Sequence, residues 1–107
     1  MIRPLISVAV GCLLLTGSAA ALAEGDAAAG RSKAETCLGC HAVDGFFNVY
    51  PTYRVPKLGG QSPGYIVSAL KAYKSGSREH GTMHANAANL SEQDMADIAA
   101  YMAGLGQ

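Results

Sequence analysis

The sequence lacks an excess of charge of either sign, since its 107 residues include eight basic and eight acidic side chains. It therefore offers little support for nucleic-acid binding, which requires a concentrated basic patch. No alternation of apolar and polar residues is long enough to predict a substantial sheet, and no internal repeat is found. The only local basic cluster, Lys71, Lys74 and Arg78, is interpreted as a solvated helix face. These absences favour a small domain built from helices.

The sequence also lacks an apolar run long enough to span a bilayer. Its first residues combine a basic Arg3, an apolar segment over residues 5–15 and small residues that end at Ala23, which is typical of a secretory signal peptide. The apolar segment is shorter than the ~20 residues of a membrane-spanning helix, so a retained anchor is the less favoured interpretation. We expect residues 1–23, including Cys12, to be removed, and residues 24–107 to form one periplasmic domain.

Two cysteines and a histidine stand together in the segment Cys37-Leu38-Gly39-Cys40-His41. This spacing is the attachment pattern of c-type haem. The two sulfurs can add to the two vinyl groups of one porphyrin while the histidine ligates the iron from the same side. The alternatives are a thioredoxin-like dithiol and half of a zinc site. Neither is supported, because no βαβ pattern surrounds the motif and no second cysteine pair follows it.

The chain around this motif is predicted to combine a helix with a loop. Asp26 is an N-cap residue and predicts a first helix that runs toward Cys37, with the haem motif at its end. Residues 46–60 are predicted to form a loop and not a sheet, because they include two prolines and a glycine pair. The aromatic residues of this loop are interpreted in three ways: as packing against a haem, as a small hydrophobic cluster, or as a partner-docking patch. They are Phe46, Phe47, Tyr50 and Tyr53.

Two further helices are predicted in the second half of the chain. Ser62-Pro63 provides an N-cap hydroxyl and a proline at the first helical position, and the helix that follows is expected to end near Gly76. Ser91 and Asp94 have the spacing of a capping box, so a last helix begins there. It is expected to reach about Ala103.

The second axial ligand of the iron decides between electron transfer and ligand-binding chemistry. Met95 and Met102 lie on the apolar face of the last helix, where methionine commonly fills a core. Met83 is the preferred ligand, because we expect it in an irregular stretch that can bend toward the iron. His84 would instead give a bis-histidine haem of lower potential. His80 and His84 could also form a divalent-metal site, but two ligands alone make a weak metal site. We therefore favour the interpretation that both are exposed side chains.

With these residues in hand, the chain resembles the small periplasmic class I cytochromes c of bacteria, which are related to the domains of some dihaem respiratory cytochromes. The resemblance covers residues 24–107 and rests on the cysteine–histidine motif, the segment 56–61, the predicted helices and Met83. It implies an all-α fold, the class I cytochrome c fold, with three or more helices wrapped around one covalently bound haem c.

The resemblance also implies roles for residues outside the motif. The backbone carbonyl of Pro56 is expected to accept a hydrogen bond from the ring of His41. Arg78 is expected near a haem propionate, with a plain surface charge as the alternative. The first and last helices are expected to cross at Gly30, with Tyr101 packed nearby.

The function expected from these features is electron transfer and not catalysis: one electron carried in the periplasm on a haem c ligated by His41 and Met83. Redox partner proteins would be a respiratory complex, an oxidase or a flavoprotein dehydrogenase. One alternative is a haem c electron-accepting subunit of a periplasmic flavoprotein dehydrogenase of the sulfide type, whose cytochrome subunits the segment 50–56 and the histidine loop resemble. Another is a gas-binding or peroxidatic haem domain with an open iron.

Overall fold

The computed structural model describes residues 24–106. The predicted signal peptide, residues 1–23 with Cys12, and the last residue, Gln107, lie outside the described residues. Within residues 24–106, no helix is long and apolar enough to cross a bilayer.

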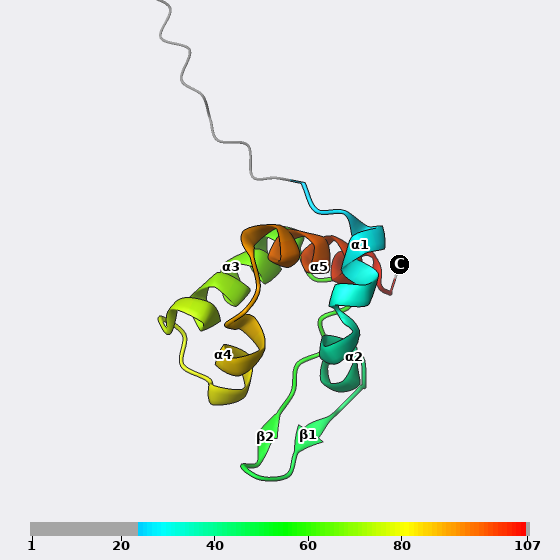
Figure 1. Ribbon diagram of the computed structural model, residues 1–107. Coiled ribbons are helices and arrows are strands. Elements are labelled where there is room, and N and C mark those ends of the chain that lie inside the picture. The colour runs from blue at the N-terminus through cyan, green and yellow to red at the C-terminus, as the bar shows by residue number, and fades with distance from the viewer. Residues whose placement is uncertain (1–23, 107) are drawn as a thin grey trace, which may run out of the picture.

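The described chain consists of five helices and one two-stranded antiparallel sheet (Figure 1). Helix α5 packs against α3 and is crossed by α1, and these three helices form one layer, from which α2 and α4 extend on opposite sides of the molecule (Figure 1). The strands form a hairpin that lies farthest from this layer in Figure 1. The elements are α1 (Ala27–Lys33), α2 (Glu35–His41), β1 (Phe47–Asn48), β2 (Tyr53–Arg54), α3 (Pro63–Ser75), α4 (Gly81–Ala87) and α5 (Glu92–Gly104).

The first predicted helix is divided into α1 and α2. Asp26 caps α1 as expected, since its carboxylate accepts the backbone N–H of Ala28 at 2.9 Å. The helix does not continue to Cys37, however, but ends at Lys33. The next residue, Ala34, is fully buried. Its carbonyl accepts the N–H of Cys37, three residues later, at 2.9 Å, whereas the usual α-helical bond joins residues four apart. The haem motif therefore lies within a separate helix, α2.

The predicted bounds of α3 are confirmed, and those of α5 differ by one residue. Ser62 caps α3, Pro63 is its first residue, and Gly76 ends it in the left-handed conformation at φ 82°. The capping box of α5 is also present, with the Asp94 N–H donating to Ser91 Oγ at 3.0 Å and the Ser91 N–H donating to Asp94 Oδ2 at 2.9 Å. α5 extends one residue past its expected end.

The expected loop over residues 46–60 contains a short hairpin, so the prediction of a loop without a sheet was wrong for four residues. Phe47 pairs with Arg54 and Asn48 with Tyr53 in antiparallel register. The Val55 N–H also donates to the Phe46 carbonyl at 2.9 Å. Strands of two residues are too short to produce an alternating pattern that sequence can reveal.

α1 and α5 cross at Gly30, as the resemblance implied. A Cβ atom at this position would lie 1.9 Å from the carbonyl oxygen of Asp97 and 2.9 Å from the Cβ of Tyr101. A Cβ at Gly25 would lie 1.8 Å from the carbonyl oxygen of Ala96, also in α5. Glycine is therefore needed at two points for the chain to approach α5 this closely.

A buried carboxylate joins α5 to α1 beside this crossing. Asp97 is only 3% exposed, and its Oδ2 lies 2.6 Å from Lys33 Nζ. Its Oδ1 accepts the backbone N–H of Asp26 and the side-chain amide of Gln93, each at 2.8 Å. These three hydrogen bonds, of which the one from Lys33 has the largest effect, lower the pKa of Asp97 from 3.8 to about 2. Asp97 thus connects the start of the described chain to its last helix.

The hydrophobic core lies between α3 and α5 and also includes Ala34, between α1 and α2, and Ala87 of α4. Met95 and Met102 are each only 1% exposed, so their interpretation as core side chains is confirmed. The buried apolar cluster consists of Ala34, Ile66, Leu70, Ala87, Met95, Ile98, Ala99 and Met102.

We predict that the protein loses stability as the pH falls from about 4 to about 2. Folding lowers the pKa of Asp97 from its ordinary value of 3.8 to about 2. The ionised carboxylate therefore contributes its full stabilisation of the folded state above pH 3.8, and this stabilisation is lost as the pH falls through about 2. Asp97→Asn should lower the thermal unfolding midpoint at pH 7 and flatten this acid dependence. Circular dichroism melts between pH 2 and 7 would measure both. The exposed Glu79→Gln serves as control, and an Asp97→Asn protein with unchanged melts would contradict the prediction.

Candidate metal centre

Helix α2 places both cysteines of the motif on one face, because residues three apart are neighbours on a helix surface. Cys37 is half-buried and packs against the core, whereas Cys40 is exposed, and both are free thiols. Burial raises the pKa of the Cys37 thiol. The two sulfurs are thus available to one ligand lying along this helix.

His41 ends α2 with a fixed ring orientation. The residue is only 8% exposed, and its Nδ1 lies 2.6 Å from the backbone carbonyl oxygen of Pro56. Because a carbonyl can only accept, Nδ1 carries the proton and donates, which leaves Nε2 as the nitrogen that can bind a metal. The hydrogen bond implied by the resemblance is therefore present. The Leu58 N–H donates to the His41 carbonyl at 3.3 Å and ties the same segment to the end of α2.

Met83 lies in a helix, so its expected position in an irregular stretch was wrong. It is the third residue of α4 and is half-buried, with its side chain against the core cluster. The cap of this helix is His80, whose Nδ1 accepts the Met83 N–H at 3.3 Å. Sequence analysis missed this helix because histidine is not among the preferred N-cap residues and glycine is a poor first helical residue.

The two histidines near Met83 have separate partners. His84 is exposed and its Nδ1 donates to the backbone carbonyl of Tyr73 at 2.8 Å. His80 is half-buried, and its ring lies edge-on to Tyr53 with centroids 4.7 Å apart. The expectation of an exposed side chain therefore holds for His84 but not for His80. In residues 24–106 no group of three or more His, Cys, Asp or Glu residues could hold a metal ion.

The candidate ligands lie on two helices that face each other across the molecule (Figure 1). α2 packs against α1, and α4 packs against α3, whereas α2 and α4 make no contact with each other in the described part of the chain. α2 offers the two thiols of the motif and the imidazole nitrogen of His41, and α4 offers the thioether of Met83. This donor set fits a haem c with His/Met ligation.

Arg78 follows the end of α3, is exposed, and lays its side chain against that helix. Its guanidinium is 4.8 Å from the centroid of the Tyr73 ring, and Nη1 donates to the hydroxyl of Tyr65 at 3.3 Å. The hydrogen bond to Tyr65 raises the pKa of Arg78. A contact with a haem propionate stays a prediction.

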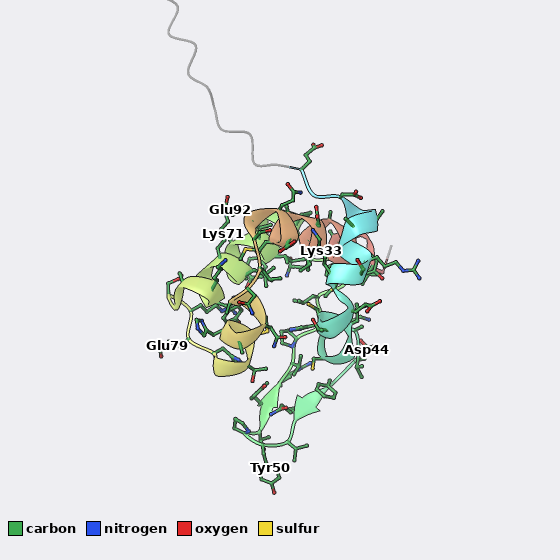
Figure 2. All side chains as sticks on the ribbon, viewed as in Figure 1. Lys33, Asp44, Tyr50, Lys71, Glu79 and Glu92 are labelled. Atoms are coloured by element: carbon green, nitrogen blue, oxygen red, sulfur yellow. The ribbon has the colours of Figure 1, made fainter. Side chains whose placement is uncertain are left out.

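The aromatic residues of the hairpin divide into two groups. Tyr53 is half-buried against His80, while Phe47 is 56% exposed and Tyr50 is 92% exposed. Figure 2 shows Tyr50 projecting from the tip of the hairpin. Val49, beside it, is 66% exposed. The interpretation as a buried hydrophobic cluster therefore fails for Phe47 and Tyr50, and their exposure is typical of a contact surface.

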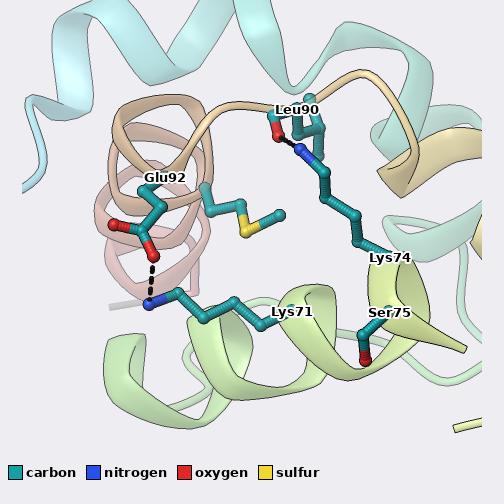
Figure 3. A pocket seen from close by; sticks show the side chains of 6 residues that line it. Lys71, Lys74, Ser75, Leu90 and Glu92 are labelled. Atoms are coloured by element: carbon teal, nitrogen blue, oxygen red, sulfur yellow. Dashed lines mark hydrogen bonds and ion pairs between the residues drawn. The ribbon is translucent and has the colours of Figure 1, made fainter. Parts of the chain in front are cut away.

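Lys71 and Lys74, the two lysines of the basic cluster, border a hollow of about 430 Å³ that is separate from the candidate ligands (Figure 3). Lys71 pairs with Glu92 at 2.9 Å, and Lys74 donates to the backbone carbonyl of Leu90. Both lysines thus hold the start of α5 against α3. The hollow is lined by Lys71, Lys74, Ser75, Leu90, Glu92 and Met95.

Comparison with known proteins identifies the family. Residues 27–106 match the family model described as Cytochrome c. Cytochrome c-554(548) of Halomonas halodenitrificans is 49% identical over 80 residues, which cover 72% of this chain and 93% of that protein. The cytochrome subunit of sulfide dehydrogenase from Chlorobaculum tepidum is 33% identical over 72 residues, which cover 67% of this chain and 62% of that protein. The solved structure of Acidithiobacillus ferrooxidans cytochrome c4 is similar with a TM-score of 0.58 and 29% identity, over 78% of this chain and 52% of that one.

The fold and the donor set define an all-α protein with the class I cytochrome c fold. The chain belongs to the cytochrome c family, since the family model covers nearly all of its described residues. Membership implies a covalently bound haem c and electron transfer by that haem. The chain spans about half the length of the cytochrome c4 relatives it matches.

We predict that the haem is attached through the two motif cysteines, Cys37 and Cys40. A Cys37→Ala/Cys40→Ala double variant should carry no haem that survives denaturation, because no thioether bond can form. Haem staining of a denaturing gel would measure this. The matched control is Gly39→Ala within the same motif, where an added Cβ would meet nothing within 4 Å, so it should retain the stain. A stained double variant would disprove the attachment.

Proposed function

We propose that this chain is a periplasmic electron carrier that holds one haem c through Cys37, Cys40 and His41, with Met83 as the second axial ligand. The observation that carries the proposal is the pairing of an anchored imidazole on α2 with a thioether on the facing helix α4. Such a haem supplies one-electron chemistry between ferrous and ferric iron. The signal-like pattern of residues 1–23 supports export.

The protein's part in this function is to fix the ligands and tune their electronic character. His41 donates from Nδ1 to the Pro56 carbonyl, which sets the ring orientation and makes the other nitrogen a better donor. Methionine ligation at Met83 raises the reduction potential. With His41 and Met83 both holding the haem, no position would be left for a substrate, and the chemistry that the group would supply is one-electron transfer. We include Arg78 in the proposal as a propionate contact.

We predict that Met83 decides whether the iron is closed to exogenous ligands. The oxidised protein should show the weak near-infrared band of a thioether on ferric iron, and the reduced protein should not bind carbon monoxide. Met83→Ala should lose the band and bind carbon monoxide, because one axial position becomes accessible. Absorption spectra with and without the gas would measure both.

The control for this test is Met95→Leu, which replaces a core methionine by a residue of similar size and should leave both properties unchanged. A Met83→Ala spectrum identical to that of the unmodified protein would exclude Met83 as a ligand. Ready gas binding by the unmodified protein would favour the gas-binding or peroxidatic alternative.

A second candidate function is that of an electron-accepting subunit of a flavoprotein dehydrogenase. Two observations favour it: the exposed apolar tip of the hairpin, and the similarity to the cytochrome subunit of a sulfide dehydrogenase. Under this function the tip, residues 47–50, would form the permanent contact with the flavoprotein.

For this second function we predict that the protein purifies from its native host with stoichiometric flavin. Phe47→Ser/Tyr50→Ser should release most of the flavin, because it removes the exposed apolar side chains, without altering the haem spectrum. Flavin fluorescence per haem would measure the complex. The neighbouring exposed Thr52→Ser is the control. A monomer without flavin would rule this function out and leave the free carrier.

A further inference from the structure

The side chain of His80 contacts the backbone of the proposed iron ligand directly. Its Nδ1 accepts the N–H of Met83 at 3.3 Å in the first turn of α4. The same ring lies edge-on to Tyr53 of β2, with centroids 4.7 Å apart and planes at 84°. It also lies edge-on to Tyr73 of α3, at 6.2 Å. His80 is thus held between a strand and a helix while it caps α4.

A second contact joins the hairpin to the residue next to Met83. The hydroxyl of Tyr53 donates to Thr82 Oγ1 at 2.9 Å. Tyr53 therefore reaches α4 twice, through its ring at His80 and through its hydroxyl at Thr82. These contacts cross between segments that are far apart in sequence, so they fix the start of α4 relative to the hairpin.

A helix as short as α4, with seven residues, has little stability of its own. The direction of the Met83 side chain consequently depends on the groups that hold the first turn of the helix. At the other side of α4, His84 is tied to the Tyr73 carbonyl at 2.8 Å. That contact anchors α4 to α3 but does not involve the Met83 backbone.

We propose that His80 and Tyr53 are positioning residues that hold the thioether of Met83 in place for the iron. This inference rests on the proposed function, in which Met83 is the axial ligand. In this proposal neither residue is a ligand: His80 acts through the Met83 N–H, and Tyr53 acts through His80 and Thr82. Loosening these contacts leaves the thioether in place for a smaller fraction of the time, and an exogenous ligand then competes more effectively.

The test is a titration of the oxidised holoprotein with imidazole, followed at the near-infrared thioether band. His80→Ala removes both the acceptor and the ring, and should make imidazole bind about tenfold more tightly. This factor corresponds to about 1.4 kcal/mol, which lies within the range for a lost helix cap. The band of this variant should also be weaker before imidazole is added.

Two further variants separate the parts of the contact. His80→Asn keeps a side-chain acceptor for the Met83 N–H but lacks the ring, so its imidazole affinity should fall between those of the original protein and His80→Ala. Tyr53→Phe keeps the ring contact and removes only the hydroxyl that donates to Thr82. It should tighten imidazole binding by a smaller factor, about two- to fivefold, consistent with one exposed hydrogen bond.

The matched control is Ser91→Ala, which removes the cap of α5 without touching α4. It should lower the thermal midpoint as His80→Ala does, yet leave the imidazole affinity unchanged. Equal affinities of His80→Ala and the original protein would overturn the inference while Met83 remained the ligand. An effect of Ser91→Ala as large as that of His80→Ala would also overturn it. If the unmodified protein lacks the thioether band, the proposed function fails, and the inference fails with it.

Discussion

The close crossing of α1 and α5 is the constraint on which the arrangement of the site depends. At Gly30 the two backbones are near enough that any Cβ would overlap the Asp97 carbonyl. The buried Asp97 carboxylate holds the same junction through Lys33 and the Asp26 N–H. Since α2 follows α1 after a single residue, this junction also sets where the cysteines and the histidine lie. α5 in turn packs against α3, which carries α4.

One segment of the chain, residues 53–60, connects the two sides of the site and is here termed the bridging segment. At its start, Tyr53 contacts His80 and Thr82 on the methionine side. At its middle, Pro56 accepts the hydrogen bond of the His41 ring. At its end, the Gly60 N–H donates to the Met102 carbonyl in α5 at 3.0 Å. One segment thus contacts His41 directly, through the Pro56 carbonyl, and reaches Met83 indirectly, through the Tyr53 side chain with His80 and Thr82.

Sequence reasoning succeeded where the determinant is local. The cap of α3 and the capping box at Ser91 depend on residues within three positions of each other, and both were predicted. The cysteine–histidine motif is likewise a local pattern. The division of the first helix at Ala34 was not predictable, because alanine favours continued helix and only tertiary packing makes the chain turn there. The capping of α4 by His80 was missed because histidine is not a preferred N-cap residue. Its ring is held in place by Tyr53, a residue distant in sequence.

The balance of charges limits how this protein can recognise a partner. With eight basic and eight acidic residues in the sequence, long-range electrostatic steering is weak. Several charges are also engaged within the molecule, as in the pairs of Lys33 with Asp97 and Lys71 with Glu92. Between Asp44 and Arg54 the hairpin carries no charged side chain. Contacts made there would therefore depend on complementary shape and buried apolar area and not on attraction between charges.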